Sequence, residues 1–333
     1  VLVVEYKNLT LSPKNSTFKK LFPLTTSMKV LVTGGAGFIG STIVSSLLRI
    51  GYDVIVLDNL SAGKKENIKE IESNITLVEG DIKDKKLIQS LVQDVQAVIH
   101  LAAVTSVPAS VEDPKACNEA NVVASKNILE ECAKNKVKFL FASSAAVYGD
   151  DPSEIKTEDL PLKPLSPYGE SKLEVEKLCA KFNKEKDLQF TCFRIFNVYG
   201  PRQNPSSAYA SVIPLFINKA LEDESLTIFG DGEQTRDFIY VQDVADAFLL
   251  ALKENLNNVF NLGCNRSKTI NELAKMIVEK TDSSSKIVHK DARQGDIVHS
   301  RASIEKFNVA TGWEPKVSFE EGIQKTIDYY QNE

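Results

Sequence analysis

The chain has 333 residues, enough for one large domain or two moderate ones, each with its own hydrophobic core. Apolar residues make up 43% and charged residues of mixed sign 26%, a composition that argues against intrinsic disorder. The formal net charge of -5 argues against a nucleic-acid binder, since such domains carry a clustered basic surface.

The cysteines and histidines point to neither a disulfide framework nor a metal site. The five cysteines are odd in number and include no C-x-x-C pair, which fits reduced thiols in a cytoplasmic protein. The three histidines, His100, His289 and His299, lack the i, i+4 spacing of a helical metal site. We therefore expect no bound metal. No apolar run reaches transmembrane length, so we also expect no membrane partner.

Residues 1–27 differ in composition from the rest of the chain. They contain two prolines, a lysine pair and many Ser and Thr residues, without the basic and then long apolar regions of a secretory signal. A strand is predicted to begin directly at residue 28. We interpret residues 1–27 as an N-terminal extension, either the result of a misplaced translation start or an arm packed on the surface.

From residue 28 short apolar strands alternate with amphipathic helices. Strands are predicted at 28–33, 54–57, 75–78, 97–101, 138–142 and 189–195. Helices are predicted at 38–50, 85–92, 114–134 and 167–185, and Asp113-Pro114 has the form of an N-cap followed by proline. This alternation predicts a Rossmann-type, doubly wound parallel sheet, here over residues 28–200.

After residue 200 the alternation stops. A Pro-, Ser- and Asn-rich stretch precedes a helix predicted at about 208–222. Two S/T-x-x-E capping boxes, at Thr269 and Ser318, predict the starts of two later helices. We expect residues 201–233 and 265–333 to form a smaller mixed α/β domain, and residues 234–264 to return to the main sheet.

A glycine-rich turn joins the first strand to the first helix. It reads Thr33-Gly34-Gly35-Ala36-Gly37-Phe38-Ile39-Gly40. Glycines permit a tight turn and let a pyrophosphate approach the backbone, and the helix N-terminus offers unpaired N–H groups. A turn that is merely tight is the alternative, but the strand–turn–helix context favours a dinucleotide site.

Asp58 ends the second strand, 18 residues beyond Gly40. A carboxylate there can accept hydrogen bonds from an adenosine ribose. It would repel the extra phosphate of NADP by about 4 kcal/mol per unit charge at 4 Å and an effective dielectric of 20. No arginine follows to offset this repulsion. The sequence therefore predicts NAD as cofactor, with a loop-capping aspartate as the alternative.

Tyr168 and Lys172 form the candidate catalytic pair. Y-x-x-x-K alone is a weak signal, but here it opens a helix after the fifth strand, which ends at Ser144. Residues i and i+4 share a helix face, so Lys172 is expected beside Tyr168. The lysine charge and a nicotinamide cation would lower the tyrosine pKa toward neutrality. Ser144 could bind the same substrate oxygen. The alternative is a helix-start tyrosine with a solvated lysine.

These motifs together resemble the extended short-chain dehydrogenase/reductase family. The resemblance includes the glycine-rich turn, the strand end His100-Leu-Ala-Ala103, Tyr168 with Lys172, and the stretch from Arg194 to Arg202. It extends from residue 28 to about 330. It implies a Rossmann domain with a smaller sugar-nucleotide domain, and a homodimer built from the helices near 114–134 and 167–185.

The resemblance also implies individual roles. Ser144, Tyr168 and Lys172 would be catalytic. NAD would be bound by the residues Gly34, Gly37, Phe38, Ile39, Gly40, Asp58, Asn59, Asp81, Ile82, Leu101, Ala102, Ala103, Tyr168 and Lys172. Asp81 would contact adenine.

The reaction is inferred from residues that are missing. Family members first oxidise a sugar hydroxyl to a 4-keto sugar. Dehydratases of this kind carry an Asp-Glu pair directly after the catalytic hydroxyl residue, and decarboxylases need a glutamate there. Ala145 and Ala146 occupy these positions. Without an acid, the simplest outcome is return of hydride to the other face, which is epimerisation at C4.

Two arginines are candidates for the substrate diphosphate. Arg236 and Arg293 could clamp it bidentately, and Asp296 could accept from a ribose hydroxyl. Surface ion pairs are the alternative. In the epimerases that this chain resembles, the matching positions bind UDP, as does the asparagine matching Asn197.

Two features concern the sugar. The stretch beginning at Ser106, and the one from Pro201 to Pro214, are similar to UDP-N-acetylglucosamine 4-epimerases. Ser300 falls where a tyrosine narrows the pocket of epimerases restricted to UDP-glucose, so an N-acetyl group would fit. One packing difference is worth only about 1–3 kcal/mol. UDP-GlcNAc/UDP-GalNAc is therefore favoured, with UDP-Glc/UDP-Gal also possible.

Three other functions remain open. One is another sugar-nucleotide oxidoreductase such as a keto-sugar reductase, which would usually prefer NADPH. The second is a UDP-glucuronate epimerase, although no further basic residue evidently awaits the carboxylate. The third is a non-catalytic NAD-binding sensor or scaffold, which would typically have lost Tyr168 or Lys172.

Overall fold

The computed structural model describes residues 28–205, 211–292 and 298–332. The expected extension over residues 1–27 lies outside these ranges, and so does the start of the helix predicted from residue 208. Arg293 and Asp296, two predicted substrate residues, also lie outside the described residues.

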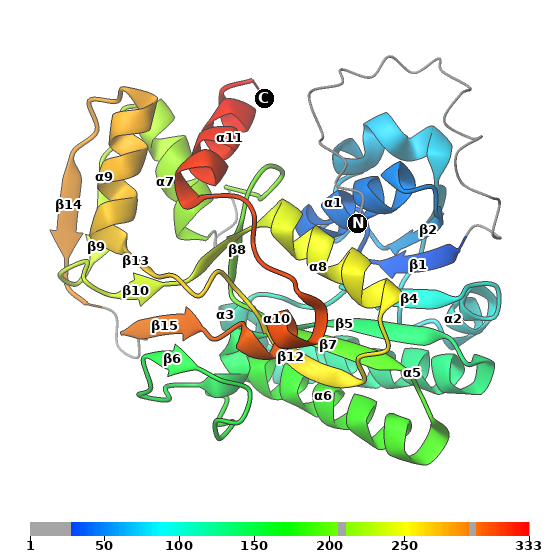
Figure 1. Cartoon of the computed structure of the whole chain (residues 1–333). Coiled ribbons are helices and arrows are strands. Elements are labelled where there is room, and N and C mark those ends of the chain that lie inside the picture. Colours follow the sequence, from blue (N-terminus) through cyan, green and yellow to red (C-terminus); the bar gives the residue numbers. More distant parts are fainter. Residues whose placement is uncertain (1–27, 206–210, 293–297, 333) are drawn as a thin grey trace, which may run out of the picture.

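A seven-stranded parallel sheet organises the larger part of the molecule (Figure 1). Its strands, in spatial order, are β12 (Asn258–Leu262), β7 (Phe190–Ile195), β5 (Lys138–Ser144), β4 (Ala97–His100), β1 (Lys29–Thr33), β2 (Asp53–Asp58) and β3 (Thr76–Glu79). All neighbouring pairs are parallel. The order reverses between β1 and β4, and doubly wound sheets bind ligands at such a point. The predicted fold class is confirmed.

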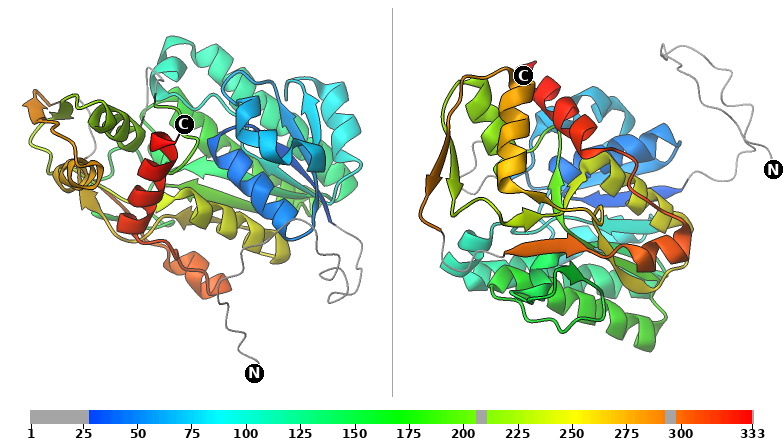
Figure 2. Two further views of the ribbon diagram at one scale, coloured as in Figure 1. Left: turned by 90° about the horizontal axis from the view of Figure 1, so that it is seen from above. Right: turned by 60° about the vertical axis from the view of Figure 1, so that its left-hand side comes forward.

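Helices cover both faces of this sheet (Figures 1 and 2). One face carries α1 (Phe38–Arg49), α8 (Val241–Lys253) and α10 (Glu305–Thr311). The other carries α2 (Lys85–Val92), α5 (Ala124–Asn135) and α6 (Pro167–Lys186). Successive strand residues point to opposite faces, so Leu31 joins the second cluster while Val30 and Val32 join the first.

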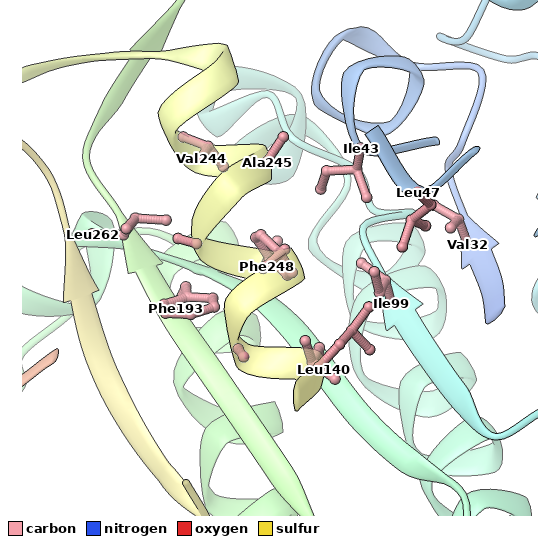
Figure 3. Packing of buried hydrophobic residues seen from close by; sticks show 14 of the residues in the cluster. Val32, Ile43, Leu47, Ile99, Leu140, Phe193, Val244, Ala245, Phe248 and Leu262 are labelled. Atoms are coloured by element: carbon pink, nitrogen blue, oxygen red, sulfur yellow. The ribbon is translucent and has the colours of Figure 1, made fainter. Parts of the chain in front are cut away.

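The core under α8 is aromatic. Phe248 of α8 meets Phe193 of β7 edge to face at 4.9 Å between ring centroids. Figure 3 shows Ile43 and Leu47 of α1 in the same cluster, on the other side of α8 from Phe193. Because each ring buries a large apolar area, this cluster fixes α1, and with it the glycine-rich turn, against the sheet.

The helix predicted over 114–134 is interrupted. Asp113 caps α4 (Pro114–Asn118) by accepting from the Ala116 N–H at 2.9 Å, as predicted. A π-helical turn, Glu119–Val123, then precedes α5. Single π turns are often found at functional sites. Three further short segments were not predicted from the sequence, namely α3 (Val107–Glu112) and the 3-10 segments Lys65–Asn74 and Ala145–Tyr148.

A second part of the molecule packs around its own apolar cluster. Its helices are α7 (Val212–Leu221), α9 (Ile270–Thr281) and α11 (Phe319–Gln331), which lie beside the strand pair β9 (Leu226–Phe229) and β14 (Ile287–Lys290) (Figure 1). Between the two parts run short strands. They are β13 (Lys268–Thr269), β10 (Thr235–Arg236), β15 (His299–Ala302) and β6 (Ile155–Lys156) in one sheet, and β8 (Asn197–Tyr199) with β11 (Phe238–Tyr240) in another.

Both predicted helix starts are found. Thr269 and Glu272 form a complete capping box at α9, and the Ser318 side chain accepts from the Glu321 N–H at α11. The pairings also cross the domain limits proposed from the sequence. Strand β6 belongs to the chain before residue 200 but pairs with β15, and Phe307, from beyond residue 264, packs under the main sheet.

Among the described residues, no helix is both long and apolar enough to cross a membrane. All five cysteines are free thiols, and only Cys264 is not fully buried.

Candidate active site

The predicted cofactor and catalytic residues lie along one edge of the sheet. The glycine-rich turn follows β1, Asp58 ends β2, Leu101 follows β4, and Ser144 ends β5. Parallel strands bring these carboxyl ends together beside the switch point between β1 and β4.

Glycine is required at different positions of the turn for different structural reasons. Gly34 has φ of 72°, and a Cβ there would lie 2.8 Å from the Ala102 nitrogen. A Cβ on Gly40 would lie 2.1 Å from the Gly34 carbonyl oxygen, so Gly40 allows α1 to pack on the turn. Gly37 is the N-cap of α1 and makes no side-chain cap. The first N–H groups of α1 are thus left without a side-chain cap and suit a phosphate.

Asp58 is 7% exposed. Its Oδ2 accepts from the Ala36 N–H at 3.0 Å and its Oδ1 from the Leu60 N–H at 2.8 Å. Asp58 therefore caps the loop that follows β2, as the alternative interpretation predicted. Each carboxylate oxygen can accept a second hydrogen bond, so the same side chain can also bind a ribose hydroxyl.

Asn59 and Asp81 meet beside Asp58. The Asn59 Nδ2 is 3.4 Å from Asp81 Oδ2, and the Lys83 N–H donates to Asp81 Oδ1 at 2.8 Å. Ile82 is 8% exposed. The loops after β2 and β3 thus bring together the residues predicted for the adenosine end.

His100, at the end of β4, is a buried connector. Its Nδ1 lies 2.7 Å from Thr33 Oγ1 and its Nε2 lies 2.7 Å from Ser125 Oγ. Burial, with a smaller effect of the Lys172 charge, lowers the pKa of His100 to about 3. A neutral imidazole therefore links the glycine-rich turn to α5, and Leu101, Ala102 and Ala103 follow it, all half-buried.

Ser144, Tyr168 and Lys172 come together as predicted from their spacing. The Ser144 side chain lies near enough to that of Tyr168 to lower its pKa. The Lys172 Nζ lies 5.7 Å from the Tyr168 ring centroid and donates to the Ala142 carbonyl oxygen at 2.8 Å. Tyr168 is half-buried and Lys172 is 3% exposed. The interpretation of Lys172 as a solvated lysine is therefore wrong.

The chain's own groups do not lower the pKa of Tyr168. Burial raises the pKa of Tyr168, and Ser144 only partly opposes this. Burial also lowers the pKa of Lys172 to about 8. Desolvation thus acts against both charged forms. The lowering expected from the sequence included the charge of a nicotinamide cation as well as that of Lys172.

Buried polar residues hydrogen-bond the backbone of Tyr168 and hold it in place. They were not predicted from the sequence. Ser171 Oγ donates to the Tyr168 carbonyl oxygen at 2.7 Å and accepts from Asn121 Nδ2 at 3.0 Å. Ser110 Oγ accepts from the Tyr168 N–H at 3.1 Å. Asn121 lies in the π turn and also pairs with the Val104 backbone. Only the surrounding fold identifies these residues, because Asn and Ser are common on exposed helices.

Three of the predicted substrate residues lie on the short strands between the two parts of the molecule. In the strand pairing, Arg236 of β10 lies opposite Ser300 of β15, and Asn197 of β8 lies opposite Phe238. Ser300 is 9% exposed, and Arg236 and Asn197 are half-buried. Ser106 caps α3, accepting from the Ala109 N–H at 3.1 Å.

Asp237 was not predicted as a functional residue. It is fully buried between Arg236 and Phe238, and its carboxylate accepts backbone N–H groups from two other segments. Asp237 follows Arg236 at the end of a polar stretch, so the sequence gives no indication that it is buried.

Comparison with known proteins supports the same picture. Residues 30–263 match the model of the NAD dependent epimerase/dehydratase family. The solved UDP-glucose 4-epimerase of Thermotoga maritima, with UDP-glucose, is 41% identical with a TM-score of 0.87, covering 92% of this chain and 99% of that one.

Two further relatives differ in substrate or reaction. The UDP-N-acetylglucosamine 4-epimerase of Methanobrevibacter ruminantium, solved with UDP-N-acetylmuramic acid, is 39% identical with a TM-score of 0.89 over 92% of this chain and 99% of that one. A UDP-N-acetyl-alpha-D-glucosaminuronate decarboxylase of Bacillus cytotoxicus is 35% identical over 315 residues, 91% of this chain and 98% of the relative. On the family match and these identities, this chain belongs to the NAD dependent epimerase/dehydratase family.

Proposed function

We propose that this protein epimerises a UDP-sugar at C4 with bound NAD, UDP-GlcNAc and UDP-GalNAc being the favoured pair. The observation that carries the proposal is the group of Ser144, Tyr168 and Lys172 at the end of β5, followed directly by two alanines. It provides for removal and return of a hydroxyl proton but offers no carboxylate at the positions where related enzymes use one.

The chain has the features that an NAD molecule requires. The turn at Gly34–Gly40 and the N-terminus of α1 would hold the pyrophosphate, and Asp58 the adenosine ribose. Asn59, Asp81 and Ile82 would border the adenine, and Leu101, Ala102 and Ala103 the middle of the cofactor. When bound, NAD supplies a hydride acceptor that can give the hydride back.

Tyr168 is the proposed acid and base. Its hydroxyl would take the proton of the sugar C4 hydroxyl and later return a proton to the same oxygen, while Ser144 holds that oxygen in line. Lys172 keeps most of its charge at pH 7, because its pKa of about 8 is above that value. Its ammonium group beside the ring would favour the tyrosinate.

The surroundings of Tyr168 support epimerisation over elimination or decarboxylation. Ala145 and Ala146 lie in the 3-10 turn that follows Ser144. A keto sugar formed there would meet no acid from these positions, and hydride return to either face remains.

The choice of sugar rests on Ser300. Its side chain lies on the same face of β15 as the buried Ala302, opposite Arg236 in the strand pairing. A small side chain there leaves room for an N-acetyl group. The similarity to a UDP-N-acetylglucosamine 4-epimerase adds support, and the similarity to a UDP-glucose 4-epimerase keeps UDP-Glc as the second candidate.

The proposal includes an arrangement of parts. Residues 28–200 and 234–264 would form the NAD-binding domain, and residues 201–233 and 265–333 the sugar-nucleotide-binding domain. Asn197 and Arg236 of the first and Arg293 and Asp296 of the second would contact the UDP-sugar. Two copies would pair through α4, the π turn, α5 and α6. Support for this comes from a groove of about 700 Å³ lined mainly by residues of α4, the π turn and α6, among them Val122 and Leu173.

The test is the product mixture formed by purified protein without added NAD. UDP-GlcNAc, UDP-Glc and UDP-glucuronate are incubated separately, and the anomeric region is followed by NMR. The galacto epimer is expected from UDP-GlcNAc. With Ser300→Tyr, that activity should fall at least tenfold relative to activity on UDP-Glc, consistent with about 1–3 kcal/mol for one packing change.

Other products would change the conclusion. Epimer from UDP-Glc alone keeps the reaction and discards the role of Ser300. Release of carbon dioxide from UDP-glucuronate would overturn the argument from Ala145 and Ala146. No product from any of the three, even with NAD supplied, would contradict epimerisation of a UDP-sugar.

A further inference from the structure

Asp237 is a fully buried carboxylate that accepts hydrogen bonds from backbone N–H groups. Its Oδ1 accepts from the Cys264 N–H at 2.7 Å and its Oδ2 from the Ala302 N–H at 3.0 Å. Burial raises the pKa of Asp237 to about 6, so the carboxylate is ionised at neutral pH. Hydrogen bonds to an ionised acceptor are about twice as strong as neutral ones, so this side chain holds its partners firmly.

The main chain of the same residue reaches a further segment. The Asp237 carbonyl oxygen accepts from both the N–H and the Nδ2 of Asn197, each at 3.1 Å. One residue therefore connects β8, the link between β10 and β11, the loop after β12, and β15. In Figure 1, β8, β10 and β15 run where the two parts of the molecule meet.

These segments carry the proposed substrate residues. Arg236 precedes Asp237, Asn197 is bound to its carbonyl oxygen, and Ser300 lies two residues before Ala302 on the same face of β15. The packing leaves little freedom. A Cβ on Gly263 would lie 2.7 Å from the Ala302 Cβ and 2.9 Å from Asp237 Oδ2.

We propose that Asp237 is a positioning residue for the sugar-nucleotide pocket, which sets Asn197, Arg236 and Ser300 in register without itself touching substrate. The inference rests on the proposed UDP-sugar site. Replacing the carboxylate by an amide would turn an NH₂ group toward one of the donors, Cys264 or Ala302, and release that segment.

Asp243 offers a matched control. It is also a buried aspartate, 1% exposed, and its two oxygens accept from the Lys316 and Val317 N–H groups at 2.9 and 3.2 Å. Asp243→Asn makes the same chemical change in α8, where the carboxylate holds the segment leading to α11 instead of the pocket strands. A general loss of rigidity should therefore affect both variants.

The experiment measures UDP affinity by calorimetry on wild type, Asp237→Asn and Asp243→Asn, and then kcat and KM on the UDP-sugar that the wild type converts. For Asp237→Asn we expect the Kd of UDP and the KM to rise at least tenfold, with kcat within threefold. Asp243→Asn should keep Kd and KM within twofold of wild type. Its melting temperature should fall by about as much as that of Asp237→Asn.

The outcomes separate the two proposals. A wild type that does not bind UDP would contradict the proposed function and, with it, this inference. UDP binding by the wild type together with equal Kd shifts in the two variants would overturn the role of Asp237 alone. If Asp237→Asn does not fold, Gly263→Ala replaces it, since the added methyl presses on the carboxylate. An unchanged Kd for that variant would then reject the inference.

Discussion

At the scale of single residues, desolvation governs the titrating groups of the site. It lowers the pKa of Lys172 to about 8 and of His100 to about 3, and it raises the pKa of Tyr168. Ser144 partly opposes the shift of Tyr168. The chain's own groups therefore keep Tyr168 protonated near neutral pH, and ionisation has to be favoured by a ligand bound next to it.

Tyr168→Phe tests the proposed acid and base. Loss of a positioned proton-transfer group should lower kcat by about 10²- to 10⁴-fold, while NAD content, measured by absorbance after denaturation, stays unchanged. Tyr148→Phe is the control. Tyr148 is a buried tyrosine that bonds Asn261 and Arg194, so its loss should lower stability by about 1 kcal/mol and leave kcat near wild type. Substantial turnover by Tyr168→Phe would reject its role.

His100 predicts how stability depends on acid. Its folded pKa is about 3 and its ordinary value 6.5, so its contribution is complete above pH 6.5 and is lost as pH falls toward 3. Between pH 7 and pH 5 this linkage amounts to about 2 kcal/mol. His100→Gln should therefore lose about 2 kcal/mol less than wild type in urea unfolding across this range. The control His289→Gln, at an exposed site, should behave as wild type, and identical pH dependence of all three proteins would contradict the assignment.

At the scale of elements, α6 carries Tyr168 and Lys172, two of the three proposed catalytic residues, on a face fixed by a buried ion pair. Tyr168, Lys172 and Glu176 follow at intervals of four residues and share that face. Glu176 binds Arg194 of β7 at 2.8 Å and accepts from Ser143 Oγ at 2.5 Å. Ser143 precedes Ser144 in β5. The Glu176–Arg194 ion pair therefore holds both the strand that carries Ser144 and the helix that carries Tyr168 and Lys172.

A double-mutant cycle tests this ion pair. Glu176→Gln or Arg194→Gln alone should lower the free energy of unfolding by about 3–5 kcal/mol, because each leaves a buried charge unpaired. The double variant should be less destabilised than the sum of the two by at least 1 kcal/mol. Urea unfolding provides the three values. Simple additivity would mean that the two side chains contribute independently.

At the scale of the whole molecule, the two parts are joined by short strands as well as by chain connections. Strand β6 from the main part completes the sheet that holds β10 and β15, and Phe307 returns to the main core. The π turn, α5 and α6 lie together on one face of the main sheet. Val123 is 46% exposed there. An apolar side chain at such a place fits a helical contact between two copies.

Val123→Arg tests the proposed dimer. Two like charges brought together at a symmetric interface repel, so light scattering after gel filtration should give a monomer mass where wild type gives a dimer. Val309→Arg is the control, since Val309 is 78% exposed on α10, away from these helices. A wild-type monomer, or a dimer that survives Val123→Arg, would contradict this interface.

The parallel sheet, the position of the glycine-rich turn and the spacing of Tyr168 and Lys172 could all be predicted from the sequence, because these depend on local periodicity and on geometry within one helix. The π turn at Asn121, the short strands between the two parts, the burial of Asp237 and the Glu176–Arg194 pair became visible only in the tertiary structure. Each of these depends on partners far along the chain. Strands of two or three residues have too little periodicity to detect, and a charged residue looks exposed until the fold encloses it.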